Sequence, residues 1–214
     1  MHRRTALKQL AALAALATPA SGAVFAQAAN TYVTLDPAQP TDDPARIEVI
    51  KFFHYGCPHC SDLAPFAHRW AAEQPADVHF RQIPAVWNNP QLSGLARLYF
   101  AAETTGDIDK LHTAIFTAVQ QERRPLHSEG AVREWIKGKV ADEKRLMDAY
   151  KSFGVNSMIQ RGDQLARAMR VNSVPTLVVD GRFLTSSSMA GGHPEAMRLV
   201  GQLVDRIRRE RAAA

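Results

Sequence analysis

Cysteine is scarce in this sequence: it has two in 214 residues, Cys57 and Cys60. Two cysteines are too few for the set of bridges that holds a disulfide-rich domain together, and too few for a four-cysteine zinc site. Because only two residues separate them, a disulfide between them closes a very small loop and constrains the unfolded chain little. We therefore expect the pair to have a chemical role and not a structural one.

Repeats and compositional bias are also missing. No segment of 20–50 residues recurs, which argues against a solenoid. The 12 glycines and 12 prolines follow no period, which excludes a collagen-like chain. Hydrophobic residues make up 46% and charged residues 22% of the chain, the balance of a folded globular protein. The length fits one domain, or one domain with an insertion.

Positive charge is in excess, but a part of the excess lies at the start of the chain. The net charge is +5, and residues 1–28 contain three basic residues and no acidic one. Without them, 23 basic residues face 21 acidic ones, a net charge of +2. The arginines from Arg206 to Arg211 are interpreted as the end of a helix, where cations complement the helix dipole. We expect no nucleic-acid partner.

Residues 1–28 have the pattern of an export signal. Arg3, Arg4 and Lys8 precede an apolar core around Leu10–Ala17, and Ala26-Gln27-Ala28 offers the small residues of a cleavage site. The core is too short to cross a bilayer, which takes about 20 residues. We expect cleavage after Ala28 and an exported protein of 186 residues. The two arginines leave the general and the twin-arginine routes both open.

Residues 29–87 are expected to form the first part of an α/β fold. The nearly continuous apolar run at 46–55 predicts a strand buried on both faces, and 78–83 predicts a second strand. The helix between them begins at Cys57 and extends to Trp70, with a kink at Pro65. A strand, a helix and a strand in this order imply a parallel crossover.

Residues 88–155 contain no strand pattern and are expected to form an all-helical insertion. Four helices are predicted, beginning at Asn89, Asp107, Ser128 and Asp142. The fourth has Leu146, Tyr150 and Phe153 on its inner side and ends at Gly154.

Residues 156–214 return to the α/β pattern. A helix is expected at 157–170, two strands flank the turn Asp180-Gly181, and a last helix begins at Pro194. The expected fold is therefore α/β, with a mixed sheet flanked by helices and an inserted helical subdomain.

The motif Cys57-Pro58-His59-Cys60 carries the chemistry. Cys57 is expected at a helix N-terminus, where free amides and the dipole favour a thiolate, the reactive form of cysteine. Pro58 and His59 are expected to tune this thiolate, His59 through its positive charge when protonated. Cys60, one turn into the helix, is expected to be the more buried, resolving thiol. Reversible redox chemistry is the favoured interpretation.

Zinc is the alternative use of the two cysteines, since His54 and His59 are nearby in the sequence. Zinc sites of this spacing usually have a second pair of ligands elsewhere, and no second pair exists here. The other histidines, including His68, His112 and His193, show no ligand spacing and are expected at the surface. We expect no metal ion and no cofactor.

Val174-Pro175 immediately precedes the strand that begins at Thr176. A cis peptide at this position would pack against the two sulfurs and leave the backbone of Val174 free to pair with a substrate strand. An ordinary trans proline at the start of a strand fits the sequence as well. The sequence leaves both alternatives open.

Together these features resemble the DsbA family of periplasmic thiol–disulfide oxidases. The resemblance lies in Phe52-Phe53 before the Cys57–Cys60 motif, the long helical insertion, and the segment 171–176, and it covers the whole mature chain. It implies a thioredoxin fold, Cys57 as the attacked sulfur, Cys60 as its partner, and Val174-Pro175 as a cis-proline contact. The family often has a buried glutamate in the helix after the motif, where this chain has Ala64; Asp62 lies on another face.

The expected function is that of a periplasmic oxidase that donates its disulfide to newly translocated proteins with free thiols. The resemblance implies reoxidation by a membrane protein of the DsbB type, and we expect a monomer. The alternatives are a reductase or isomerase with the same motif, and a non-catalytic chaperone or binding module. Only 28 mature residues precede Cys57, too few for the N-terminal dimerisation domain of a dimeric isomerase.

Overall fold

A computed structural model describes residues 31–213, so the expected signal segment 1–28 lies outside the described residues. One mixed sheet of five strands lies at the centre, in the spatial order β1-β5-β4-β2-β3. The strands are β1 Val33–Thr34, β2 Ile47–Phe53, β3 Val78–Pro84, β4 Thr176–Val179 and β5 Phe183–Ser186.

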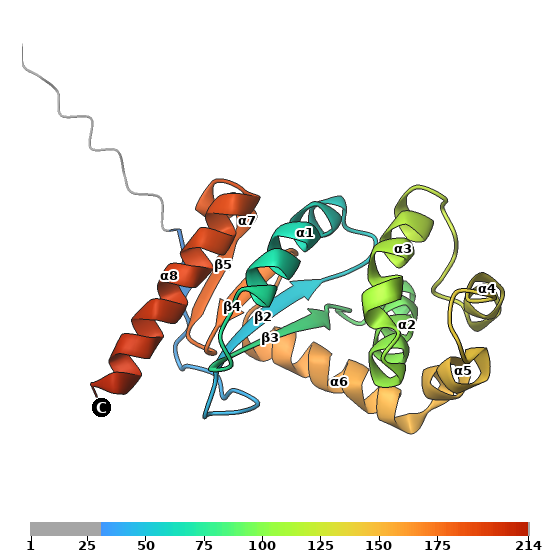
Figure 1. Cartoon of the computed structure of the whole chain (residues 1–214), viewed down its shortest axis with the longest axis horizontal. Helices are drawn as coiled ribbons and strands as arrows, with labels where there is room; N and C mark the ends of the chain where they lie inside the picture. The colour runs from blue at the N-terminus through green and yellow to red at the C-terminus, as the bar shows by residue number, and fades with distance from the viewer. Residues whose placement is uncertain (1–30, 214) are drawn as a thin grey trace, which may run out of the picture.

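Eight helices accompany the sheet in the described part of the chain (Figure 1). They are α1 Pro58–Ala72, α2 Pro90–Thr105, α3 Ile108–Gln120, α4 Glu129–Trp135, α5 Glu143–Lys151, α6 Phe153–Ala168, α7 Ser187–Ala190 and α8 His193–Ala212. None of the described helices is long and apolar enough to span a membrane.

The strand β2 lies between β4 and the edge strand β3, and all seven of its residues are buried. It pairs in parallel with β3, from Ile47 opposite Val78 to Phe53 opposite Pro84. It pairs antiparallel with β4 on its other side. The parallel crossover predicted through α1 is confirmed, as is the turn at Asp180-Gly181, which joins the antiparallel strands β4 and β5. This mixed sheet confirms the predicted α/β fold.

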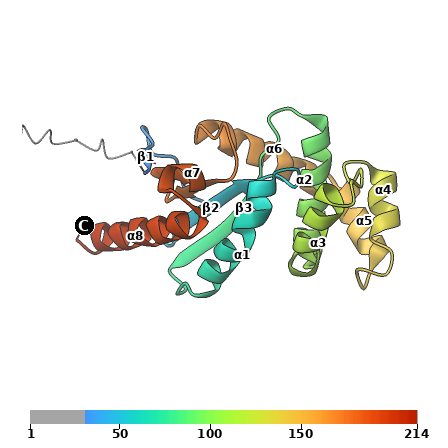
Figure 2. The same cartoon turned by 90° about the horizontal axis from the view of Figure 1, so that it is seen from above.

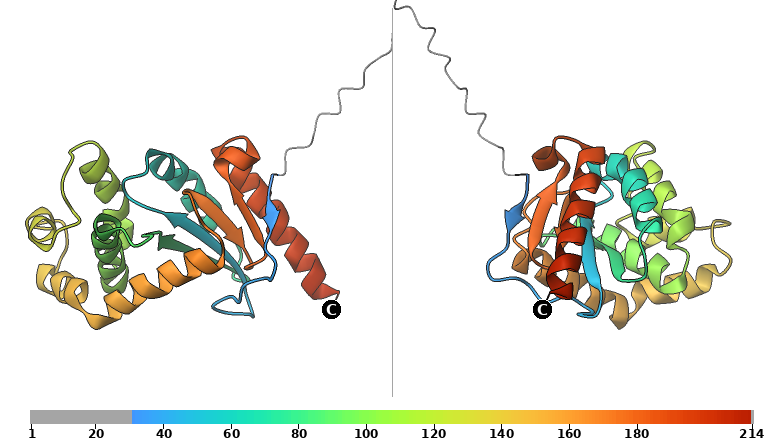
Figure 3. Two further views of the ribbon diagram at one scale, coloured as in Figure 1. Left: turned by 180° about the vertical axis from the view of Figure 1, so that it is seen from behind. Right: turned by 60° about the vertical axis from the view of Figure 1, so that its left-hand side comes forward.

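The two faces of the sheet are covered by different helices (Figures 1 and 3). Val49 and Val179 face α1 and α8, where Leu63 and Val200 are buried against them. On the opposite face, the alternate side chains of β2 and β4 pack against α6. α1 and α6 therefore sandwich the strand that leads to the cysteines.

The helices α2 to α5 form a separate block at one end of the molecule (Figure 2). Their apolar core is continuous with the end of β2, because Phe53, Tyr55, Cys57 and Cys60 belong to the same buried cluster as the helical block. The predicted helical insertion is thus present, and the two cysteines lie where it meets the sheet.

The boundary between α5 and α6 differs from the prediction. Phe153 was expected on the inner side of the fourth helix, but it begins α6 and is 85% exposed. The reason is Ser152, whose Oγ accepts a hydrogen bond from the amide of Val155 at 3.1 Å and caps a helix that starts four residues earlier than expected. Gly154 therefore lies inside α6 and ends no helix.

Three smaller features also differ from or add to the predictions. The helix α1 passes through Pro65 as predicted and ends at Ala72, two residues beyond Trp70, and the short elements β1 and α7 were not predicted. Arg208 and Arg211 near the C-terminus form ion pairs with Asp77, which directly precedes β3, and with Asp180, which directly follows β4. The arginines at the end of α8 thus dock this helix onto the sheet.

Candidate active site

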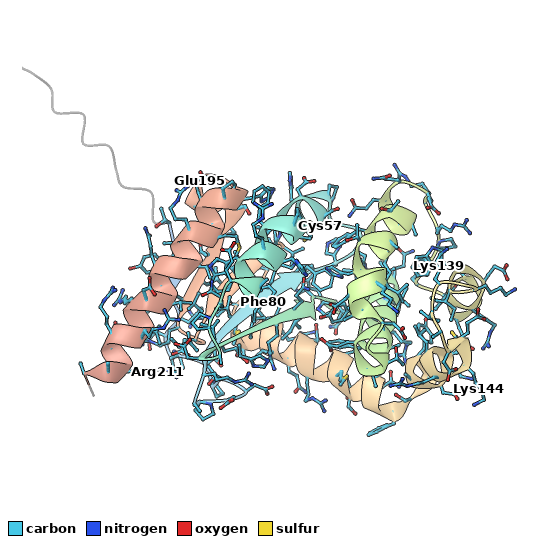
Figure 4. The ribbon with its side chains drawn as sticks, in the orientation of Figure 1. Cys57, Phe80, Lys139, Lys144, Glu195 and Arg211 are labelled. Carbon is cyan, nitrogen blue, oxygen red and sulfur yellow. The ribbon has the colours of Figure 1, made fainter. Side chains whose placement is uncertain are left out.

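The dithiol lies at the N-terminus of α1, just beyond the end of β2 (Figure 4). Cys57 is the N-cap residue, with extended backbone angles, and Pro58 is the first helical residue, where a proline needs no amide hydrogen. The Cys57 Sγ accepts a hydrogen bond from the amide of Cys60 at 3.3 Å. Both thiols are free in this structure, with Cys57 8% exposed and Cys60 completely buried.

These contacts separate the pKa values of the two thiols. A hydrogen bond from the Cys60 thiol, the Cys60 amide, and the charge of His59 together lower the pKa of Cys57 to about 7, against the opposing effect of burial. Hydrogen bonding to Cys57 and burial raise the pKa of Cys60 well above its usual value. One sulfur is therefore disposed to be a thiolate at neutral pH, while its partner keeps its proton.

His59 lies beside the thiols but faces the solvent. Its side chain is 77% exposed, and its Nδ1 is 3.9 Å from the Asp62 carboxylate. Its positive charge acts on Cys57 from outside the core, and water and salt screen such a charge. Its contribution to the pKa of Cys57 comes after those of the Cys60 thiol and amide.

We expect His59→Gln to raise the pKa of Cys57 by less than about one unit, because an exposed charge is screened. Cys60→Ala should raise this pKa more, since it removes the hydrogen bond that lowers it most. Thiolate absorbance at 240 nm against pH measures both. His68→Gln, an exposed histidine farther along the same helix, is the matched control. An unchanged pKa in His59→Gln would reduce His59 to a spacer.

Val174 approaches the dithiol although more than 100 residues separate it from Cys60. The Val174–Pro175 peptide bond is cis. The Cys57 thiol lies 3.5 Å from the carbonyl oxygen of Val174 and donates to it. The structure thus brings the Val174-Pro175 segment, through Val174, to the motif formed by Cys57, Pro58, His59 and Cys60.

Gln120 also belongs to this site, although no sequence pattern indicated it. From the last turn of α3, its Nε2 donates to the carbonyl oxygens of Tyr55 at 2.8 Å and Cys57 at 3.1 Å. These two hydrogen bonds attach the loop between β2 and α1 to the helical block. No local pattern marks such a residue, because its contacts cross more than 60 residues of sequence.

Lys51 is the second residue missed. It lies in the middle of β2 and is 1% exposed, with its Nζ 5.4 Å from the centre of the Phe53 ring. Burial lowers the pKa of Lys51 to about 8, and the attraction of Cys60 partly offsets this effect. Ala64, at the position where the family often has a glutamate, is an apolar contact of the helical core. The charged group buried near the thiols is therefore Lys51 of β2, and position 64 of α1 contributes no charge.

His112 was expected at the surface, and this expectation is wrong. Its Nδ1 is 2.9 Å from the Tyr55 hydroxyl, and its ring packs edge-on against Phe53 and Phe116. Burial lowers the pKa of His112 to about 3, so its ring is neutral. On α3, His112 lies between the buried residues Leu111 and Ile115. Its ring therefore lies where this helix packs against Phe53 at the end of β2.

The zinc alternative based on both cysteines finds no support in the geometry. Within residues 31–213, one set of three metal-binding side chains comes together, and it consists of His59, Asp62 and His193. The two sulfurs and His54 are not part of it.

Comparison with known proteins places the chain in one family. The model of the DSBA-like thioredoxin domain matches residues 48–197. The thiol:disulfide interchange protein DsbA of Bordetella parapertussis is 36% identical over 211 residues, covering 98% of this chain and 100% of the relative. The protein of the same name from Pseudomonas aeruginosa is 33% identical over 216 residues, covering 99% of both chains.

Solved structures agree with these relatives. The crystal structure of Pseudomonas aeruginosa DsbA has a TM-score of 0.80 at 32% identity, covering 86% of this chain and 94% of that one. That of reduced DsbA1 from Neisseria meningitidis has a TM-score of 0.76 at 25% identity, covering 86% and 96%. The predicted thioredoxin fold is confirmed, and the chain belongs to the family of DSBA-like thioredoxin domains.

Proposed function

We propose that this protein is a periplasmic oxidant that donates the Cys57–Cys60 disulfide to newly translocated proteins. Its family membership makes it a thiol–disulfide oxidoreductase that acts on substrate proteins and exchanges electrons with a redox partner. The observation that carries the proposed direction is the separation of the two pKa values, with that of Cys57 lowered and that of Cys60 raised. An oxidant of this kind is favoured when its reduced form is stabilised.

The reaction consists of two thiol–disulfide exchanges. A substrate thiolate attacks the Cys57 sulfur, the Cys57–Cys60 bond breaks, and Cys60 leaves and takes up a proton. The second thiolate of the substrate then attacks the substrate sulfur of the mixed disulfide, and Cys57 leaves as a thiolate. The substrate has lost two electrons and two protons in total, and the enzyme is left with Cys57 and Cys60 reduced. Cys57 is a good leaving group because its pKa is low.

Val174 is proposed to bind the substrate backbone beside Cys57. Within the described residues, no backbone or side-chain group accepts the amide hydrogen of Val174. A substrate strand can supply an acceptor there and add to the segment before β4, as in strand addition to an edge. The 3.5 Å contact between the Cys57 sulfur and the Val174 carbonyl oxygen supports this role, because this sulfur is the one that would form the mixed disulfide.

Reoxidation by a DsbB-type membrane protein, export with removal of residues 1–28, and a monomeric state complete the proposal. The direct test mixes the disulfide form with a peptide that has two thiols at pH 7. We expect stoichiometric oxidation of the peptide and weak reduction of insulin in the presence of dithiothreitol. Strong insulin reduction with slow peptide oxidation would favour a reductase or isomerase, and no reaction in either assay would favour a binding module.

A further inference from the structure

Three side chains with metal-binding atoms meet beside the dithiol without including it. His59 and Asp62 lie one turn apart on α1, and His193 is the first residue of α8. One ligand atom from each of the three lies within 4.8 Å of the other two. The N-terminal ends of α1 and α8 lie along the same edge of the molecule, as the labels Cys57 and Glu195 indicate in Figure 4.

The donor set determines which ion would fit. Two imidazole nitrogens and one carboxylate oxygen are ligands that zinc binds, at about 2.0–2.2 Å. Tetrahedral ligands at these distances are about 3.4 Å apart, close to the 3.9 Å between His59 Nδ1 and the Asp62 carboxylate. Both side chains are mostly exposed, 77% and 62%, so a small rotation closes the difference without disturbing the core.

His193 is held in a manner that suits a ligand. Its Nδ1 is 2.7 Å from the Oγ of Ser187, in α7, and its ring lies 6.1 Å from that of Phe66. A histidine that binds a metal through one ring nitrogen usually donates the hydrogen of the other to an oxygen, which fixes its tautomer and orientation. Donation from Nδ1 to Ser187 leaves the lone pair of Nε2 for the ion.

We propose that His59, Asp62 and His193 form a binding site for a borderline divalent cation of the Zn²⁺ type, with the remaining coordination positions open to water. The site joins α1 to α8 and uses neither sulfur, so it does not depend on the proposed redox function. The positive ends of both helix dipoles oppose a cation here. We therefore expect a modest dissociation constant, about 1–100 μM.

The test uses the protein in its disulfide form and without a histidine tag, so that neither thiols nor added imidazoles bind the metal. Calorimetric titration with Zn²⁺ should give one equivalent. His193→Ala and Asp62→Asn should each weaken binding at least about tenfold, since each removes one of three ligands. Ser187→Ala should weaken it less, because it only frees the orientation of His193. Mg²⁺, which prefers an all-oxygen shell, should not bind.

His127→Ala is the matched control, since this histidine is exposed and lies outside the cluster. It should bind Zn²⁺ like the unchanged protein, and thermal unfolding without metal should confirm that all variants are folded. X-ray absorption at the zinc edge should show two imidazoles in the unchanged protein. The proposal is overturned by an absence of saturable binding up to about 1 mM Zn²⁺, or by equal affinity in the unchanged protein, His193→Ala and Asp62→Asn.

Discussion

At pH 7, a limiting amount of iodoacetamide should modify Cys57 at least about 100 times faster than Cys60 in the folded dithiol form. With a pKa of about 7, roughly half of Cys57 is thiolate at this pH, and thiolate is the species that reacts. Cys60 is completely buried, and its raised pKa keeps it protonated. Peptide mapping by mass spectrometry at short times measures both rates.

Two matched substitutions extend this expectation to the reaction. Cys57→Ser should abolish disulfide exchange. Cys60→Ser should still form a mixed disulfide through Cys57 when offered an oxidised peptide, and should accumulate it, because no resolving thiol remains. In guanidinium chloride the two cysteines of the unchanged protein should react at similar rates, which tests that the fold causes the difference. Faster modification of Cys60 than of Cys57 in the folded protein would reverse the proposed roles.

Lys51→Met should stabilise the dithiol form by about 3 kcal/mol at pH 7. The unfolded lysine titrates near 10.5 and the folded one at about 8, and this difference corresponds to about 3 kcal/mol against folding when the lysine is protonated. The destabilisation is complete below pH 8, because both states then hold the proton. It fades between pH 8 and 10.5, where only the unfolded state binds the proton, and is absent above this range. Methionine has a similar length and no charge to bury.

Guanidinium unfolding of both proteins from pH 7 to 10.5, with reductant present, measures this difference. The stability of Lys51→Met relative to the unchanged protein should be greatest at pH 7 and should shrink as the pH rises. Lys110→Met is the control, since Lys110 is exposed on α3 and its change should stay within about 0.5 kcal/mol. A less stable Lys51→Met at pH 7 would show that the buried lysine has a stabilising partner.

The charge of Lys51 also bears on the resolving thiol. Its attraction lowers the pKa of Cys60 in opposition to burial and to the hydrogen bond with Cys57. Lys51→Met should therefore make Cys60 a still weaker acid and a slower nucleophile toward the mixed disulfide. The buried ammonium group of Lys51 thus favours the thiolate form of Cys60, and both side chains are shielded from solvent.

The fold could be predicted from the sequence wherever a local pattern is tied to a single structure. The apolar run of β2 and the Asp180-Gly181 turn are such patterns; both turn residues have positive φ, 54° and 61°. An added Cβ at Gly181 would lie 2.0 Å from the Gln39 carbonyl oxygen, so glycine is required there. The strand β1 has only two residues, too few to show a pattern.

The parts of the site that sequence could not predict depend on contacts between distant segments. Gln120 and His193 reach the motif from α3 and α8, and neither has a spacing that marks it. Lys51 is a different case, because a lysine inside a strand expected to be buried on both faces is itself a signal of a buried charge. Phe153 was misplaced because the cap at Ser152 was not recognised.

The most direct measurement of the central claim is the absorbance of the dithiol form at 240 nm as a function of pH, with the disulfide form subtracted. One thiolate per chain should appear with a midpoint near pH 7, from Cys57 alone, and no second thiolate should form while the protein remains folded. A midpoint at the free-thiol value of about 8.5, or two thiolates that appear together, would contradict this claim.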